Sequence, residues 1–135
     1  MSRGTPAIKS VKARAVVTPM ARPVKNAFGV IDVAPLLLID VATDQGITGR
    51  SYLFAYSKIT LKAFVHLVEE IGLDLVGKPV VPYDLMGAMD AKFRLLGWQG
   101  LVGMAVSGLD MAFWDALGKA ADWPVVRLLG GAPAA

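Results

Sequence analysis

The chain has 135 residues, of which 55% are hydrophobic and 19% are charged, and its formal net charge at pH 7 is +3. Its length suits one domain with a buried core, whereas its charged fraction is below the roughly 25% usual for soluble domains. The absence of cysteine excludes disulfides, thiolate metal sites and a cysteine nucleophile. The apolar excess predicts a surface that meets another part of a longer chain or another subunit.

The distribution of charge and hydropathy bears on partners and location. Basic residues are spread from Arg3 to Arg127 without a dense block or an interleaved aromatic series, so nucleic acid is not an expected partner. The first twelve residues lack the apolar core of a signal peptide, and charges such as Asp110 interrupt the later apolar stretches. The sequence therefore predicts a soluble, cytoplasmic protein that has no membrane partner.

The first half of the chain predicts strands. Residues 7–17 alternate between apolar and polar side chains, as in a half-exposed strand. Residues 18–33 contain Pro19, Pro23 and several apolar side chains, a composition that predicts a long loop acting as a lid or binding loop.

Two more apolar segments, residues 36–41 and 47–56, flank a tight turn at residues 43–46, and with the first strand they predict a three-stranded antiparallel sheet. Core packing is the simplest interpretation of Tyr52 and Phe54 at the end of the last strand.

The second half predicts helices. Apolar residues repeat at helical spacing from Leu61 to Ile71, after Ser57 or Thr60 as a possible cap, and again from Pro82 to Leu96. The longest helix begins at Leu101, and a short helical run follows at residues 125–129. Strands followed by helices predict an α+β domain, a three-stranded antiparallel sheet backed by three helices.

The long helix contains two carboxylates that deserve a chemical interpretation. Asp115 and Lys119 are four residues apart and are expected to pair on the helix surface. Asp110 and Asp115 are five apart and do not share a face, which favours capping or pairing over metal binding. Gly108, in the middle of this helix, costs about 1 kcal/mol relative to alanine, and we expect it to admit another backbone at close range.

Catalytic patterns are absent from the sequence. His66 is the only histidine and falls on the polar side of its helix, where a solvated residue is expected. No G-x-S-x-G elbow, phosphate loop or dinucleotide glycine pattern occurs. The residues themselves predict neither a catalytic site nor a metal site in this chain.

Three stretches carry a family resemblance. The run GLDMAFWDALGKAADWPVVRLLGG, residues 108–131, resembles the signature that closes the amino-terminal capping domain in the mandelate racemase and muconate lactonizing enzyme group of the enolase superfamily. APLLLIDVATDQGITGRSYLFAY at residues 34–56 and RAVVTPMARPVKNAFG at residues 14–29 are similar to the mandelate racemases of that group. The resemblance covers nearly the whole chain.

The resemblance implies a division of labour between two domains. Residues 1–131 would be the capping domain, and residues 132–135 would begin a linker to a (β/α) barrel that this chain lacks. In such enzymes, barrel acids hold Mg²⁺ and barrel lysines or histidines abstract the proton α to a carboxylate. These groups have no matching position here, so the 135-residue chain alone is not expected to catalyse or to bind the metal. A barrel in cis or in another subunit, and a homo-oligomer, are the expected partners.

The resemblance also assigns a substrate-binding lid. Val24 and Ile31 match apolar contacts to the substrate's aryl ring, Asn26 occupies the place of a small polar lid residue, and Tyr56 matches a tyrosine of the second lid segment. Phe28 is bulkier than the family pattern. The implied substrate is a small, mandelate-like 2-hydroxy carboxylate in a racemase, which is an isomerase. Packing of Val24 and Ile31 against the domain's own sheet is the alternative.

Two other functions remain open from the sequence. The chain could be a non-catalytic binding or assembly module without a barrel, or the cap of another superfamily member, such as an acid-sugar dehydratase or a cycloisomerase.

Overall fold

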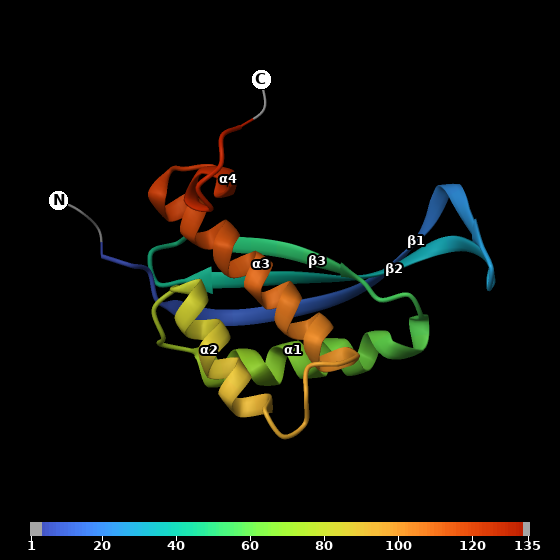
Figure 1. The fold of residues 1–135 in the computed structure, drawn as a ribbon, viewed down its shortest axis with the longest axis horizontal. Helices are drawn as coiled ribbons and strands as arrows, with labels where there is room; N and C mark the ends of the chain where they lie inside the picture. Colours follow the sequence, from blue (N-terminus) through green and yellow to red (C-terminus); the bar gives the residue numbers. More distant parts are fainter. Residues whose placement is uncertain (1–3, 134–135) are drawn as a thin grey trace.

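Three antiparallel strands form a sheet, and four helices follow them in the chain (Figure 1). The structure is a computed structural model and describes residues 4–133. The strands, in the sheet order β1-β2-β3, are β1 (Ile8–Asn26), β2 (Gly29–Thr43) and β3 (Thr48–Phe54). The helices are α1 (Leu61–Leu75), α2 (Pro82–Phe93), α3 (Leu101–Ala121) and the short α4 (Val125–Leu128), with a 3₁₀ turn, η1 (Lys58–Thr60), before α1. The predicted α+β architecture is confirmed. Residues 1–3 and 134–135, which belong to the predicted cap and linker, lie outside the described residues.

The segment predicted to be a loop, residues 18–33, is instead a β-hairpin that extends the sheet beyond the helices (Figure 1). Val24 pairs with Ile31, and the only irregularity in this part of the ladder lies between Pro19 and Val24. The loop prediction was wrong because β1 is an edge strand, where prolines are tolerated and a bulge takes up extra residues. We call residues 20–31 the arm; its residues 21–30 are all exposed.

The sheet buries one face against the helices. Leu37, Ile39 and Val41 of β2 are each 0% exposed, whereas the residues between them lie on the opposite face, which we call the outer face. Tyr52 is 64% exposed, so its interpretation as a core residue was wrong. The reason is register, because Tyr52 pairs with Leu38 and shares its outer face. The largest fully buried side chains include Phe64, Phe113, Ile8, Leu37, Ile39, Met89 and Leu109.

Glycines allow α3 to lie close to the sheet. A Cβ on Gly108 would lie 2.6 Å from Ile39 Cδ1, so side chains, and not the expected backbone, occupy the space over this glycine. The close backbone approach occurs at Gly49 of β3, where a Cβ would lie 2.0 Å from the carbonyl oxygen of Ala112. The glycine that brings helix and strand backbones together is therefore on the strand.

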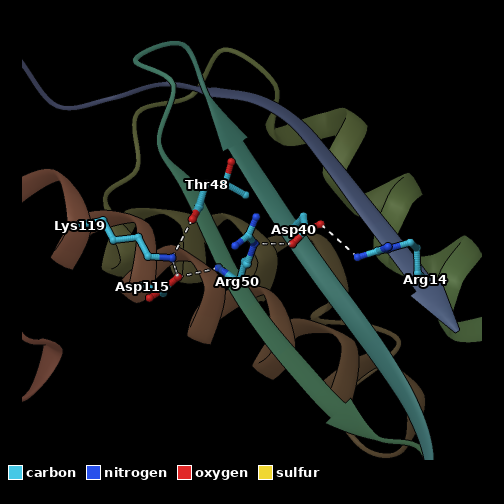
Figure 2. A network of polar contacts seen from close by, with 6 residues as sticks. All are labelled: Arg14, Asp40, Thr48, Arg50, Asp115 and Lys119. Atoms are coloured by element: carbon cyan, nitrogen blue, oxygen red, sulfur yellow. Dashed lines mark hydrogen bonds and ion pairs between the residues drawn. The ribbon is translucent and has the colours of Figure 1, made fainter. Parts of the chain in front are cut away.

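Side chains of α3 also cover the free edge of β3 (Figure 2). Asp115 Oδ2 accepts hydrogen bonds from the Arg50 backbone N–H at 2.7 Å and from Lys119 Nζ at 2.5 Å. Lys119 Nζ also donates to the Thr48 carbonyl oxygen at 2.9 Å. The predicted pairing of Asp115 with Lys119 is confirmed, and it satisfies backbone groups that an edge strand otherwise leaves open.

The ends of the helices follow local sequence signals. Pro82 occupies the first turn of α2, and the Ser57 side chain accepts a hydrogen bond from the Ile59 N–H at 3.3 Å at the start of η1. Ser57, and not Thr60, is therefore the residue whose side chain caps.

Helix α3 is long and apolar enough to cross a membrane by length and composition, contrary to our expectation. However, 50% of its apolar window is buried in the fold, and core helices of soluble proteins pass the same test.

Candidate functional site

The arm and the residues after β3 lie at the same end of the sheet (Figure 1). The Ala55 N–H donates to the Pro35 carbonyl oxygen at 2.8 Å, which places Tyr56 beside the base of the arm. Ile31 is four residues further along β2, or about 13 Å at 3.3 Å per residue. The two segments that sequence reasoning assigned to one lid therefore lie at the same end of the sheet, about 13 Å apart along β2.

Val24 and Ile31 form a cross-strand pair on the arm. Directly paired residues in an antiparallel ladder project from the same face. Val24 is 48% exposed, so it does not pack into the core of the domain, whereas Ile31 is half-buried. The pair offers an apolar contact beyond the part of the sheet that the helices cover.

Asn26 lies at the tip of the arm. Its Oδ1 accepts a hydrogen bond from the Phe28 N–H at 2.9 Å, and Gly29 follows with a φ of 133°, a conformation that favours glycine. The structure therefore gives the Asn26 side chain a role in closing the hairpin turn. A substrate contact by this residue stays a prediction.

Tyr56 is held in an unusual conformation at the base of the arm. Its φ is 58°, in the left-handed region that bulky side chains rarely adopt. Its ring packs edge-to-face against Phe54 with centroids 4.9 Å apart, yet the residue is 73% exposed. Strained backbone of this kind is concentrated at binding and active sites, which supports the selection of Tyr56.

Three more apolar residues at this end of the molecule are exposed and were not among the predicted site residues. Phe28 at the arm tip is 99% exposed, Val30 is 58% exposed and Ile59 of η1 is 91% exposed. Composition cannot distinguish an exposed apolar side chain from a core one. The available signal for Phe28 was its position in an Asn-x-Phe-Gly turn, which cannot lie in a core strand. Val30 projects from the opposite face of the hairpin to its neighbour Ile31. We therefore call Val24, Phe28, Ile31, Tyr56 and Ile59 the lid surface.

Acid and base groups do not gather within the described chain. Among residues 4–133 no three His, Asp or Glu side chains are placed to hold a metal ion. His66 is exposed on α1, as expected. Burial raises the pKa of Asp110, and a side-chain hydrogen bond with Trp114 partly opposes that effect. The described residues therefore present exposed apolar side chains at this end of the sheet but no assembled acid–base site.

A family model matches most of the chain. The model described as mandelate racemase / muconate lactonizing enzyme, N-terminal domain, matches residues 8–130. This match confirms the family resemblance that residues 108–131 and 34–56 indicated.

Three relatives illustrate the similarity. An enolase from Bradyrhizobium, complexed with magnesium and mandelic acid, is 72% identical, with a TM-score of 0.91 over 96% of this chain and 36% of that chain. An enolase from an alphaproteobacterium, BAL199, with bound magnesium is 36% identical, with a TM-score of 0.89 and the same shares covered. The D-galactonate dehydratase of Variovorax paradoxus is 36% identical over 99 residues, which are 70% of this chain and 24% of that protein. The chain therefore spans only about a quarter to a third of these relatives.

Proposed function

This chain belongs to the mandelate racemase / muconate lactonizing enzyme family, and we propose that it is the lid of a magnesium-dependent enzyme that racemises a small, mandelate-like 2-hydroxy carboxylate. The proposed reaction is abstraction and return of the proton α to the carboxylate. The observation that carries this proposal is the lid surface, a set of mostly exposed aliphatic and aromatic side chains on the arm and η1 that includes the strained Tyr56.

The relatives support the choice of substrate. The Bradyrhizobium enolase, which is 72% identical over nearly this whole chain, was crystallised with mandelic acid. An apolar lid suits the phenyl ring of such an acid better than the hydroxyl groups of a sugar acid, because unpaired hydroxyls are costly to desolvate.

The proposed role of this chain is binding and exclusion of water. Val24 and Ile31 would contact the aryl ring from the arm, while Tyr56 would close the pocket from the base of the arm. Removal of water strengthens the electrostatic interactions of the charged groups beneath such a lid. Because the described residues do not fit a metal site, we assign magnesium and the acid–base groups to a barrel domain beyond this chain.

An acid-sugar dehydratase is the second candidate, because the D-galactonate dehydratase of Variovorax paradoxus matches 70% of the chain. A non-catalytic assembly module is the third, and it predicts that no barrel partner restores activity.

A domain exchange would test these candidates. This chain would replace the corresponding part of the Bradyrhizobium enolase, and the chimera would be assayed for racemisation of (R)-mandelate and for dehydration of D-galactonate. We expect racemisation only. Dehydration of D-galactonate would favour the second candidate, and a folded but inactive chimera would favour the third.

Lid variants of the same chimera would test the residues. Val24→Asp and Tyr56→Asp should raise KM for mandelate by about tenfold or more, since a loss of roughly 1.4 kcal/mol of binding is a factor of ten. KM for lactate, which has no ring, should change less. Leu73→Asp is the matched control, because Leu73 is 67% exposed in the last turn of α1. Helix α1 runs away from the arm (Figure 1). Equal effects of the lid variants on both acids would refute the lid assignment.

A further inference from the structure

The outer face of the sheet carries a hollow that the proposed lid function does not use. Its volume is about 320 Å³, and residues from all three strands line it: Arg14, Leu38, Asp40, Arg50, Ser51 and Tyr52. Arg14, Asp40 and Arg50 lie in a row across the strands (Figure 2). No described helix covers this face, since α1 and α3 pack on the opposite one.

The charges in the hollow are unbalanced. Arg50 Nε lies 3.3 Å from Asp40 Oδ1, and Arg14 Nη2 lies 3.8 Å from Asp40 Oδ2. One carboxylate thus faces two guanidinium groups, which leaves one net positive charge. The Arg14 and Arg50 side chains are 70% and 71% exposed, and most of their ten N–H donors have no protein acceptor among the described residues. This arrangement can accept a further anion.

The wall beside these charges is apolar. Leu38 and Tyr52 are directly paired between β2 and β3, so their side chains are neighbours on the outer face. Tyr52 is 64% exposed, is two residues from Arg50 on the same face of β3, and lines the hollow with it. An anion with an apolar group attached to it would contact both the charges and this wall.

The geometry points to a binding site for a carboxylate joined to a small apolar group. The planar fork of arginine matches a carboxylate with two parallel hydrogen bonds, and Leu38 and Tyr52 would contact the attached group. A second copy of the chain is disfavoured as the occupant, because face-to-face copies would oppose two patches of the same net charge. The carboxylate comes either from a free organic acid or from an acidic side chain of another protein. This site rests on the outer-face contacts alone and is independent of the lid function.

Nuclear magnetic resonance titration of the 135-residue chain would test the site. The probes are sodium benzoate as a free acid, the peptide acetyl-Ala-Glu-Ala-amide as a protein-like carboxylate, and inorganic phosphate, all at constant ionic strength. We expect benzoate or the peptide to shift the Arg14 and Arg50 Nε–H and Tyr52 amide resonances in a saturable way. The probe that binds more tightly identifies the source. Tighter binding of phosphate, or shifts spread evenly over all basic residues, would overturn the proposal.

Variants provide the control. Arg50→Gln keeps the backbone N–H that Asp115 binds, and Arg14→Gln is a second variant that does not touch this contact. Each should weaken carboxylate binding at least fivefold. Arg94→Gln, whose side chain is 73% exposed and pairs with Asp90 on α2, should leave it unchanged. Binding that survives both Arg50→Gln and Arg14→Gln would also overturn the proposal.

Discussion

The contact of Asp115 with the edge of β3 leads to a quantitative prediction about stability. Replacement of Asp115 by alanine removes the acceptor of the Arg50 N–H and one of the two acceptors of Lys119 Nζ. Hydrogen bonds to a charged group contribute about 1.5 to 3 kcal/mol each where water is excluded. The Asp115 side chain is 32% exposed, so water partly replaces both bonds in the variant. We expect a loss of about 1 to 2 kcal/mol in the free energy of unfolding.

Urea denaturation followed by tryptophan fluorescence would measure this loss. Asp115→Asn retains one acceptor oxygen and should lose about half as much. Asp90→Ala is the control, because Asp90 makes only an exposed pair with Arg94 at 3.7 Å and should lose less than about 0.5 kcal/mol.

Hydrogen exchange provides a second, local measurement. The Arg50 amide should exchange faster in Asp115→Ala, whereas amides of α1 should change only as much as the global stability does. The reasoning is refuted if Asp115→Ala is no more destabilising than Asp90→Ala, or if exchange at Arg50 is unchanged.

Three further predictions concern packing, pH and the arm. Gly49→Ala should destabilise the chain by about 3 kcal/mol or more, because the new Cβ would meet the Ala112 carbonyl oxygen. Gly87→Ala, with open space around it in α2, should stabilise the chain by up to about 1 kcal/mol. Thermal denaturation of both variants checks this prediction. Because burial raises the pKa of Asp110 above 3.8, the folded state binds this proton more tightly than the unfolded chain. The wild type should therefore lose stability relative to Asp110→Asn as the pH rises from 3.8 through the folded-state pKa. Urea denaturation of both proteins from about pH 3.5 to 7 checks this, and a constant difference between their free energies of unfolding would contradict it. Replacement of residues 20–31 by a two-residue turn should change the free energy of unfolding by less than about 1 kcal/mol, because residues 21–30 are exposed. A larger loss in urea denaturation would show that the arm supports the core.

The helices and the sheet could be predicted because each has a regular apolar period. Leu37, Ile39 and Val41 alternate with side chains on the other face, and Phe64, Val68 and Ile71 recur at helical spacing. Neither pattern depends on distant parts of the chain. The turn at residues 43–46 was equally visible from its composition.

The arm could not be predicted because its strands depend on pairing between distant residues. Pro19 and Pro23 indicate a break when β1 is considered alone, and only the edge position of β1 makes them compatible with a ladder. The exposure of Tyr52 was not predicted for the same reason, since Tyr52 differs from a core aromatic residue only in what surrounds it.

The candidate site was predictable in part. The resemblance selected Val24, Ile31 and Tyr56, and the structure brings their segments to one end of the sheet. It did not show the left-handed backbone of Tyr56 or the exposure of Ile59, both of which arise from the path of the chain between β3 and α1.

The separation of the exposed arm from the buried sheet has an evolutionary consequence. Substitutions within residues 21–30 alter the chemistry of the lid surface without removing contacts from the core, so they leave folding nearly neutral. Selection can then act on ligand preference at these positions while the scaffold stays constant. Under the proposed lid function, such a family would diversify its substrates through a short hairpin, and we expect the sequence of that hairpin to vary among descendants faster than the residues around Leu37 and Phe113.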